Sequence, residues 1–211
     1  QAGAGTIPTD VIRCKGNYAL NFCTIGMESA AIIHTMKINR FLERGGALLR
    51  YMHRCLYKHM YYLGGFLAAF NKKIISQHYD IIIDREVISG NFQSINIANG
   101  PCYGEDKHAV ITALPNDGML DILIGKSMGF FRSLSLIRPY VKGRYHEFPS
   151  DFILKRGRYV SIRSDSLLMI NMDDEIFFDT SFTAEVLPGA VKIVSPRGFT
   201  YEKRADFRET T

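Results

Sequence analysis

The acidic run Asp173-Asp174-Glu175 is the segment of this sequence whose side chains are best suited to chemistry. It lies between two apolar segments, 167–170 and 176–178, so we expect it at a turn between two strands. A carboxylate there can accept the proton of an attacking hydroxyl group, or can help to organise a magnesium ion through water. Acidic turns between strands are also common without any chemistry, and the spacing alone favours that plainer interpretation.

The elements that must position this run begin with helices. Apolar residues recur at steps of three and four over 29–42 and again over 47–70. Gly45-Gly46 separates the two predicted helices, and Gly64-Gly65 is expected to weaken or interrupt the second one. A third helix is predicted over 128–141, with Ser127 as its N-cap and Pro139 kinking or ending it.

Most of the sequence after Lys73 is predicted to form strands. β-branched residues cluster there in short segments, which are separated by turn sequences such as Asn116-Asp117-Gly118 and Pro188-Gly189. Many short strands joined by close turns are typical of a mainly β fold. We therefore predict an antiparallel β-sandwich-like domain with a helical insertion at 29–70.

The composition limits the classes of partner. The chain has 211 residues, of which 46% are hydrophobic, enough for one sizeable core. Lysine and arginine number 26 against 21 acidic residues, giving a net charge of +5. This balance favours an anionic membrane surface or a phosphorylated ligand, and it falls short of a nucleic-acid-binding arm. Oligomeric state cannot be read from the sequence.

Cysteine usage and hydropathy bear on the compartment. The four cysteines lie far apart and form no CxxC pair, so a reducing cytoplasm is the simplest expectation. No apolar run reaches the roughly 18 to 20 residues that span a bilayer. A membrane, if involved, would be contacted peripherally at its inner face. The six histidines show no paired metal spacing with an acidic third ligand.

Three segments resemble the second domain of the diacylglycerol kinase, sphingosine kinase and bacterial lipid kinase superfamily. Residues 21–30 are similar to the family's N-x-x-x-x-G-F-D-A, with Glu28 in place of aspartate. Residues 99–121 keep the ending Asp-Gly-x-Leu-Asp, but Val110-Ile111 replaces an Ala-Pro pair and Gly104-Glu105 replaces a glycine pair. Residues 171–196 resemble N-x-D-G-E followed by E-V-L-P-G-A, with Asp174 in place of glycine. The run 185–190 is the most specific match.

The resemblance implies roles for individual residues. Asp173 would accept the proton of a lipid hydroxyl, and Glu175 would help to organise the catalytic magnesium through water. A second, structural magnesium ion would be held by Leu114, Asp117 and Met119, although Asn116-Asp117-Gly118 is a strong turn sequence with or without a metal. The tyrosines at 51, 57, 61 and 62 could line an acyl-chain cleft or lie at a membrane interface, with half-buried packing as the more ordinary role.

The resemblance also implies a missing partner domain. The family's nucleotide-binding Gly-Gly-Asp-Gly-Thr segment is not found in the sequence, so ATP would be bound mainly by a domain outside this chain. We expect residues 1–9 to be a linker from that domain, 10–200 to be the lipid kinase C-terminal domain, and 201–211 to be a charged tail. The expected function is the substrate side of an ATP-dependent kinase for a diacylglycerol-like or sphingoid lipid, the chain alone being inactive. Alternatives are a non-catalytic lipid-binding or regulatory relative and an NAD kinase-related protein.

Overall fold

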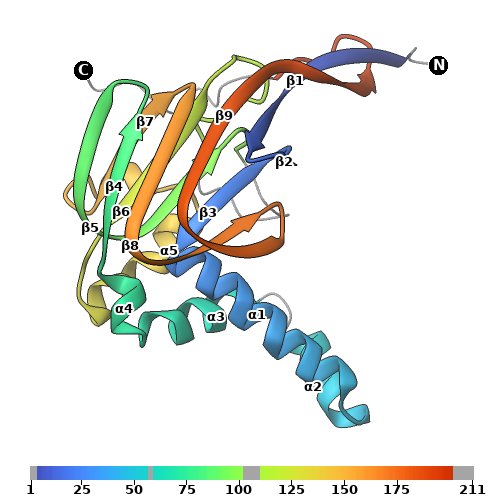
Figure 1. The fold of residues 1–211 in the computed structure, drawn as a ribbon. Helices are drawn as coiled ribbons and strands as arrows, with labels where there is room; N and C mark the ends of the chain where they lie inside the picture. The colour runs from blue at the N-terminus through green and yellow to red at the C-terminus, as the bar shows by residue number, and fades with distance from the viewer. Residues whose placement is uncertain (1–3, 57–58, 102–109, 202–211) are drawn as a thin grey trace.

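The computed structural model describes residues 4–56, 59–101 and 110–201, and its described strands form one antiparallel sheet (Figure 1). Along the sheet the order is β2-β1-β9-β8-β3-β5-β6-β7, and β4 pairs with both β5 and β8. The strands are β1 (Ala4–Cys14), β2 (Asn17–Ala19), β3 (Phe22–Gly26), β4 (Gln77–Ile83), β5 (Glu86–Ala98), β6 (Leu120–Lys126), β7 (Phe152–Gly157), β8 (Tyr159–Met172) and β9 (Glu175–Pro196). The prediction of a mainly β, antiparallel fold is confirmed.

The register of the sheet shows which strands share a neighbour. β3 pairs with the end of β5 and the end of β8, while β4 pairs with the opposite halves of the same two strands. β3 and β4 therefore lie end to end between β5 and β8. Alternate side chains of these strands point inward, so Ile25, Ile97 and Ile170 are fully buried in the main core. The long strand β9 then curls from β8 round to β1 (Figure 1).

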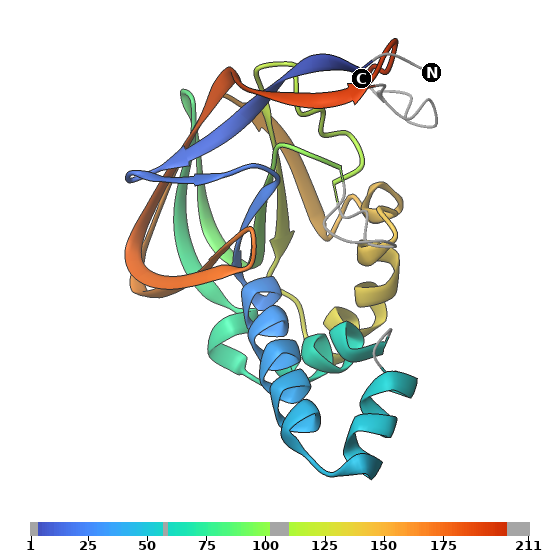
Figure 2. The ribbon, with the colours of Figure 1, turned by 90° about the vertical axis from the view of Figure 1, so that its right-hand side faces the viewer.

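The helices gather at one end and along one side of the sheet (Figures 1 and 2). They are α1 (Met27–Arg44), α2 (Ala47–Leu56), α3 (Met60–Ala69), α4 (Lys72–Ile75) and α5 (Phe130–Val141), with a short 3₁₀ helix at Tyr145–Glu147. Two smaller apolar clusters lie outside the main core. One packs α5 and residues 110–113 against strands of the sheet, and the other packs α1, α3, α4 and α5 against one another. The far end of α1 and the whole of α2 project away from the sheet.

The predicted helix over 47–70 is in fact two helices. α2 ends at Leu56 and α3 begins at Met60, so the break precedes Gly64-Gly65. The glycine pair lies inside α3 because a Cβ atom at Gly64 would come 2.3 Å from the carbonyl oxygen of Ala31. A side chain there would force α1 and α3 apart. Periodicity could not reveal this tertiary reason for the glycine.

Other predicted boundaries also need correction. α5 begins at Phe130 with Gly129 as its N-cap, so Ser127 does not cap it, and Pro139 lies within the helix. The predicted linker at 1–9 is already strand from Ala4, because β1 pairs with β9 from Ala4 onward. Residues 202–211 of the predicted charged tail lie outside the described residues. Tyr57, from the predicted tyrosine stripe, also lies outside them.

Candidate functional site

The acidic run forms the tight turn between β8 and β9. Asp173 and Asp174 are its two central residues, with φ angles of 40° and 70°, and Met172 pairs with Glu175 across it. Two consecutive positive φ angles are the mark of a type I′ turn, whose twist matches that of a hairpin. Aspartate tolerates this left-handed conformation better than most residues do. Asp174 therefore occupies the motif's glycine position without opening the turn.

The Asp173 carboxylate lies in a cradle of backbone amides. The N–H groups of Leu20, Asn21 and Phe22 donate hydrogen bonds to its two oxygens, the shortest from each residue being 2.5, 3.2 and 2.9 Å. The Asp173 N–H in turn donates to the carbonyl oxygen of Phe22. These bonds tie the β8–β9 turn to the link between β2 and β3. They fix the carboxylate in one orientation and occupy part of its accepting capacity.

Glu175 lies in different surroundings, although it is only two residues away. It is the first residue of β9, its side chain is exposed, and among the described residues no hydrogen bond or ion pair of that side chain is found. The turn thus combines a carboxylate that the fold holds in place with one that is accessible from solvent. Both residues remain predictions as catalytic groups.

The second predicted site, at Leu114, Asp117 and Met119, has a guanidinium group beside it. One oxygen of Asp117 accepts the N–H of Met119 at 3.1 Å, and the other accepts from Nη2 of Arg156. Nε of Arg156 also lies 3.4 Å from the buried carboxylate of Asp121. Within the described residues no group of three or more histidines, cysteines or acids could hold a metal ion.

A magnesium ion at this turn would compete with Arg156 for the Asp117 carboxylate. Magnesium takes near-octahedral oxygen ligands, and each oxygen of the Asp117 carboxylate already accepts one hydrogen bond, which leaves each oxygen one further lone pair. A divalent cation at this carboxylate would also repel the guanidinium group of Arg156. No chemical step is assigned to a metal at this turn, and its occupancy stays a prediction.

Asp10 ties this turn to the most specific sequence motif. Its side chain, 2% exposed, accepts the N–H of Gly118 through one oxygen and that of Gly189 through the other, both at 2.7 Å. Both glycines have positive φ angles, 68° and 58°. The Asp10 N–H donates to the carbonyl oxygen of Pro115 at 2.7 Å. One buried carboxylate thus holds the 114–119 turn against the β9 bulge at Pro188-Gly189.

Two motif asparagines carry buried polar atoms whose partners are incomplete. Nδ2 of Asn99 donates to the carbonyl oxygens of Asp10 and Leu20, while its Oδ1 has no hydrogen bond within the described residues. Asn171, two residues before Asp173, is fully buried, and neither polar atom of its side chain has a partner there. A buried polar group without a hydrogen bond lowers the stability of a fold, and water or a ligand often supplies the missing partner.

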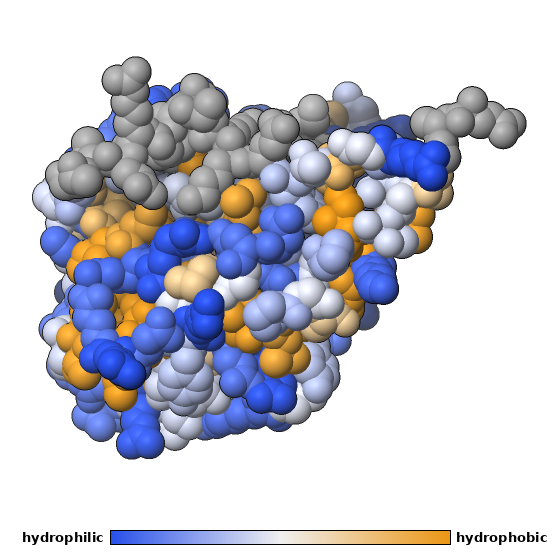
Figure 3. All heavy atoms as spheres, turned by 90° about the horizontal axis from the view of Figure 1, so that it is seen from above, coloured by the Kyte–Doolittle hydropathy of each residue, from blue (hydrophilic) through white to orange (hydrophobic). Residues whose placement is uncertain are grey.

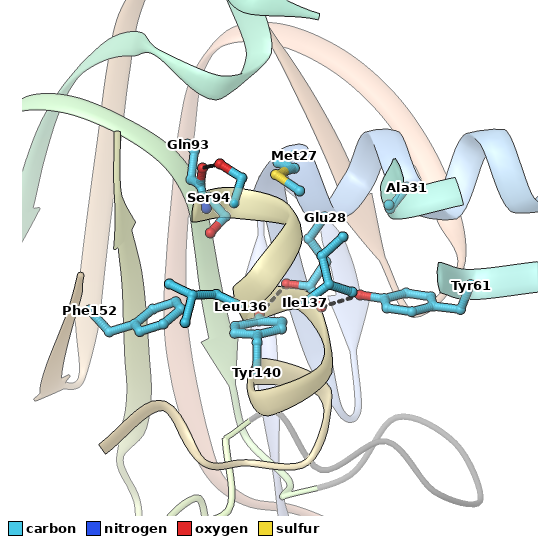
Figure 4. Close-up of a pocket in the computed structure, with 12 residues that line it drawn as sticks. Met27, Glu28, Ala31, Tyr61, Gln93, Ser94, Leu136, Ile137, Tyr140 and Phe152 are labelled. Carbon is cyan, nitrogen blue, oxygen red and sulfur yellow. Dashed lines mark hydrogen bonds between the residues drawn. The ribbon is translucent and has the colours of Figure 1, made fainter. Parts of the chain in front are cut away.

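A pocket opens between the helices and the sheet (Figure 4). The buried carboxylate of Glu28, in the first turn of α1, accepts hydrogen bonds there from the hydroxyl groups of Tyr140 at 2.5 Å and Tyr61 at 3.4 Å. Burial, and then the charge of Glu28, raises the pKa of Tyr61 well above its ordinary value. The remaining lining is mostly apolar, from Met27, Ala31, Leu136, Ile137 and Phe152 among others.

The size of this pocket limits what it can hold. It offers about 40 Å³, room for two or three water molecules. That enclosed volume is smaller than an acyl chain. Glu28 and its two tyrosines are better described as a buried polar network that joins α1, α3 and α5. Of the predicted tyrosine stripe, Tyr61 is buried and Tyr51 is exposed.

Comparison with known proteins identifies the domain. Residues 50–195 match the family model described as the YegS C-terminal NAD kinase beta sandwich-like domain. The chain belongs to this family. The resemblance inferred from the three motifs is thereby confirmed.

Relatives of this YegS-type domain carry kinase names. A Staphylococcus haemolyticus protein (strain JCSC1435) named "Putative lipid kinase" is 21% identical over 88% of the chain, and a Staphylococcus aureus protein (strain JH9) of the same description is 22% identical over 88%. The chain spans 56% of the length of each of these relatives. The activity of the whole protein is therefore a matter for proposal.

Solved structures agree on the fold. One Bacillus anthracis protein, described as a diacylglycerol kinase, matches 89% of the chain and 53% of its own length, with a TM-score of 0.56 at 19% identity. A second, described as a "putative diacylglycerol kinase", matches 89% and 56%, with a TM-score of 0.62 at 21% identity. At these identities the likeness shows the fold alone.

The YegS-type domain contains site residues that sequence reasoning missed. Asp10 is visible as a lone charge in the run Thr9 to Ile12, whose residues are all buried, yet its glycine partners lie 108 and 179 residues away. Arg156 gives no sequence signal at all, because it is one of many scattered cations. Tyr140 lies in a helix that was predicted, but its hydrogen bond to Glu28 spans 112 residues.

Proposed function

We propose that this domain is the substrate side of an ATP-dependent lipid kinase that phosphorylates a hydroxyl group of a diacylglycerol-like or sphingoid lipid. The observation that carries the proposal is the β8–β9 turn, in which a fixed carboxylate, Asp173, lies beside an exposed one, Glu175. It occurs in a domain whose relatives carry lipid kinase names. Phosphoryl transfer depends mainly on the positioning of the reacting groups, and it requires a group that orients the attacking hydroxyl.

In this proposal the two carboxylates of the turn have different roles. Asp173 would accept the proton of the lipid hydroxyl as the oxygen attacks phosphorus, since the backbone cradle at residues 20–22 holds it in one place. Glu175, exposed at the start of β9, would orient water around the cation that accompanies ATP. Magnesium, bound with ATP mainly by the part of the protein outside this chain, would neutralise charge on the phosphates.

A second candidate function rests on the same turn. Because backbone N–H groups already use both oxygens of Asp173, that residue could serve only to fix the β2–β3 link. The domain would then be a non-catalytic relative that binds lipid or regulates a kinase. An NAD kinase-related activity is a third possibility, with no observation here that favours it.

A lipid-panel phosphorylation assay tests the proposal. The full-length protein is incubated with labelled ATP and, separately, diacylglycerols, sphingoid bases and NAD. Label transferred to a lipid, and lost in Asp173→Asn, supports the kinase. No transfer to any lipid by well-folded protein favours the non-catalytic function, and transfer to NAD overturns both.

A further inference from the structure

We infer that the far end of the helical layer is a docking surface for an anionic lipid bilayer. This surface, the α1–α2 tip, comprises residues 36–55, which form the second half of α1, the link at Gly45-Gly46 and most of α2. The inference does not depend on catalysis, because it concerns binding to a membrane surface and can be measured without any phosphorylation.

The first observation is a set of large apolar side chains that face solvent. Phe41, Leu48 and Tyr51 are 68%, 72% and 67% exposed. On α2, Leu48, Tyr51 and Cys55 follow one another at steps of three and four, so they share one exposed face. Among the described residues nothing covers this face. Single exposed apolar residues are ordinary, but an aligned set on a projecting helix marks an interaction surface.

The second observation is the charge of the same surface. Lys37, Arg40, Arg44, Arg50 and Arg54 are all exposed, and in the described part of the chain none of them takes part in an ion pair. The one carboxylate between residues 36 and 55 is that of Glu43, which lies 3.9 Å from Nε2 of His53. Five cations against one anion give the tip most of the net charge of +5 that the whole chain carries.

The two sets of side chains are arranged as an interfacial helix requires. At 100° per residue, Arg50 and Arg54 form a row beside the Leu48, Tyr51 and Cys55 face. Arginine can bury its stem while its guanidinium reaches phosphate groups, and tyrosine is favoured where the apolar region of a bilayer meets water. A helix with an apolar stripe bordered along one side by arginines therefore suits the surface of an anionic membrane.

Within the described part of the chain, the position of the tip suits such contact. The 18 residues of α1 correspond to roughly 27 Å of helix, and both ribbon views show α2 at the extremity of the molecule (Figures 1 and 2). The face seen from above lies at the opposite end of the molecule (Figures 1 and 3). Hydrophobic residues there form small groups separated by hydrophilic ones (Figure 3).

Charge also decides between a bilayer and a second copy of this chain. A symmetric dimer through the tip would place five cations against five. Such like-charge contact is unfavourable, whereas an anionic bilayer attracts every one of these residues, each tightening binding by about fivefold. The bilayer is thus the occupant that the surface fits best.

Vesicle sedimentation tests the inference. Purified protein is mixed with vesicles of phosphatidylcholine alone or of phosphatidylcholine with phosphatidylglycerol, and the bound fraction is measured. We expect binding only to the anionic vesicles, and its loss as salt rises from about 0.1 M to about 1 M, where the Debye length falls from about 10 to about 3 Å. The double variant Arg50→Gln/Arg54→Gln should bind roughly 25-fold more weakly, about fivefold for each charge. Leu48→Asp should weaken binding by about tenfold or more.

Matched controls lie on the sheet. Val87, 68% exposed, is on β5, and Arg85 and Arg158 are exposed at or beside strand ends remote from the tip. Val87→Asp and Arg85→Gln/Arg158→Gln make the same chemical changes and should leave vesicle binding unchanged. Equal loss in the control variants, or equal binding to neutral vesicles, overturns the inference. So does a dimer, seen by sedimentation velocity, that Leu48→Asp abolishes while vesicle binding is unaffected.

Discussion

The carboxylate of Asp10 accepts a hydrogen bond from the N–H of Gly189, 179 residues later in the chain, at 2.7 Å. Its other oxygen accepts from Gly118, so a single side chain joins the Asn116-Asp117-Gly118 turn to the Pro188-Gly189 bulge. These are parts of the second and third motif segments. The two glycines are needed because their positive φ angles point the N–H groups at one carboxylate. The motifs therefore describe one buried structural node as well as a candidate active site.

Asp10→Ala should destabilise the domain strongly. The substitution leaves two backbone N–H groups without their acceptor. Each costs about 1–3 kcal/mol, so we expect a loss of roughly 2–6 kcal/mol in the free energy of unfolding. Urea denaturation followed by circular dichroism measures this. Asp165→Ala removes an exposed aspartate and should change the free energy by less than about 0.5 kcal/mol. Equal stability of the two variants would mean that Asp10 is not a structural node.

The strands could be predicted from sequence because their signal is local. Ile95, Ile97, Ile122 and Ile124 alternate along β5 and β6, and turn sequences bound the segments. The acidic turn was predictable for the same reason. The Asp10 node and the Arg156 contacts were not, since their partners are brought together only by the completed sheet. The break between α2 and α3 was misplaced because apolar periodicity continues through it.

Gly64→Ala should be destabilising even though alanine favours helix. Its Cβ atom would meet the carbonyl oxygen of Ala31 at 2.3 Å, so α1 and α3 must separate, and overpacking of this kind costs about 1–3 kcal/mol. The adjacent Gly65 is the control, because its Cβ atom would meet the flexible end of Ile137 at 3.1 Å. Gly65→Ala should be neutral or stabilising by up to about 1 kcal/mol. A lower melting temperature for Gly65→Ala than for Gly64→Ala would contradict the packing argument.

The turn at Asp117 offers a direct test of guanidinium against magnesium. With Arg156 bonded to Asp117 and close to Asp121, we expect millimolar magnesium to leave the melting temperature of the unmodified domain unchanged. Arg156→Gln removes the guanidinium group from both carboxylates, while Asp121 keeps its hydrogen bond from Thr112 and Asp117 keeps that from the Met119 N–H. That variant should be less stable and should gain a magnesium-dependent rise in melting temperature, by mass action. Calorimetry with and without magnesium measures both effects.

If magnesium binds at Leu114, Asp117 and Met119, the opposite effect on the melting temperature is expected. The unmodified domain would be stabilised by magnesium, and Asp117→Asn would abolish that response. Calcium serves as the control ion, because its longer and more variable coordination distances separate a magnesium-specific site from a general effect of divalent charge.

Asp173 is the residue whose substitution is most informative about chemistry. In the full-length kinase that we propose, Asp173→Asn should lower the turnover number by about 10² to 10⁴, the range for loss of a positioned general base, with little change in substrate affinity. The structure adds a complication, because the asparagine NH₂ group would face backbone N–H donors at residues 20–22. Unfolding must therefore be measured on the same samples, and we expect a loss of about 1–3 kcal/mol.

Two neighbours separate chemistry from structure in the same assay. Glu175→Gln should leave stability unchanged, since the side chain is exposed, and should make activity more dependent on magnesium concentration, with about 10- to 100-fold weaker cation affinity. Asp174→Asn should be nearly silent, because asparagine also tolerates a φ angle of 70°. Full turnover in a destabilised Asp173→Asn would show that this carboxylate only anchors the β2–β3 link. Equal losses of activity in all three variants would show that the turn is only a solvated acidic loop.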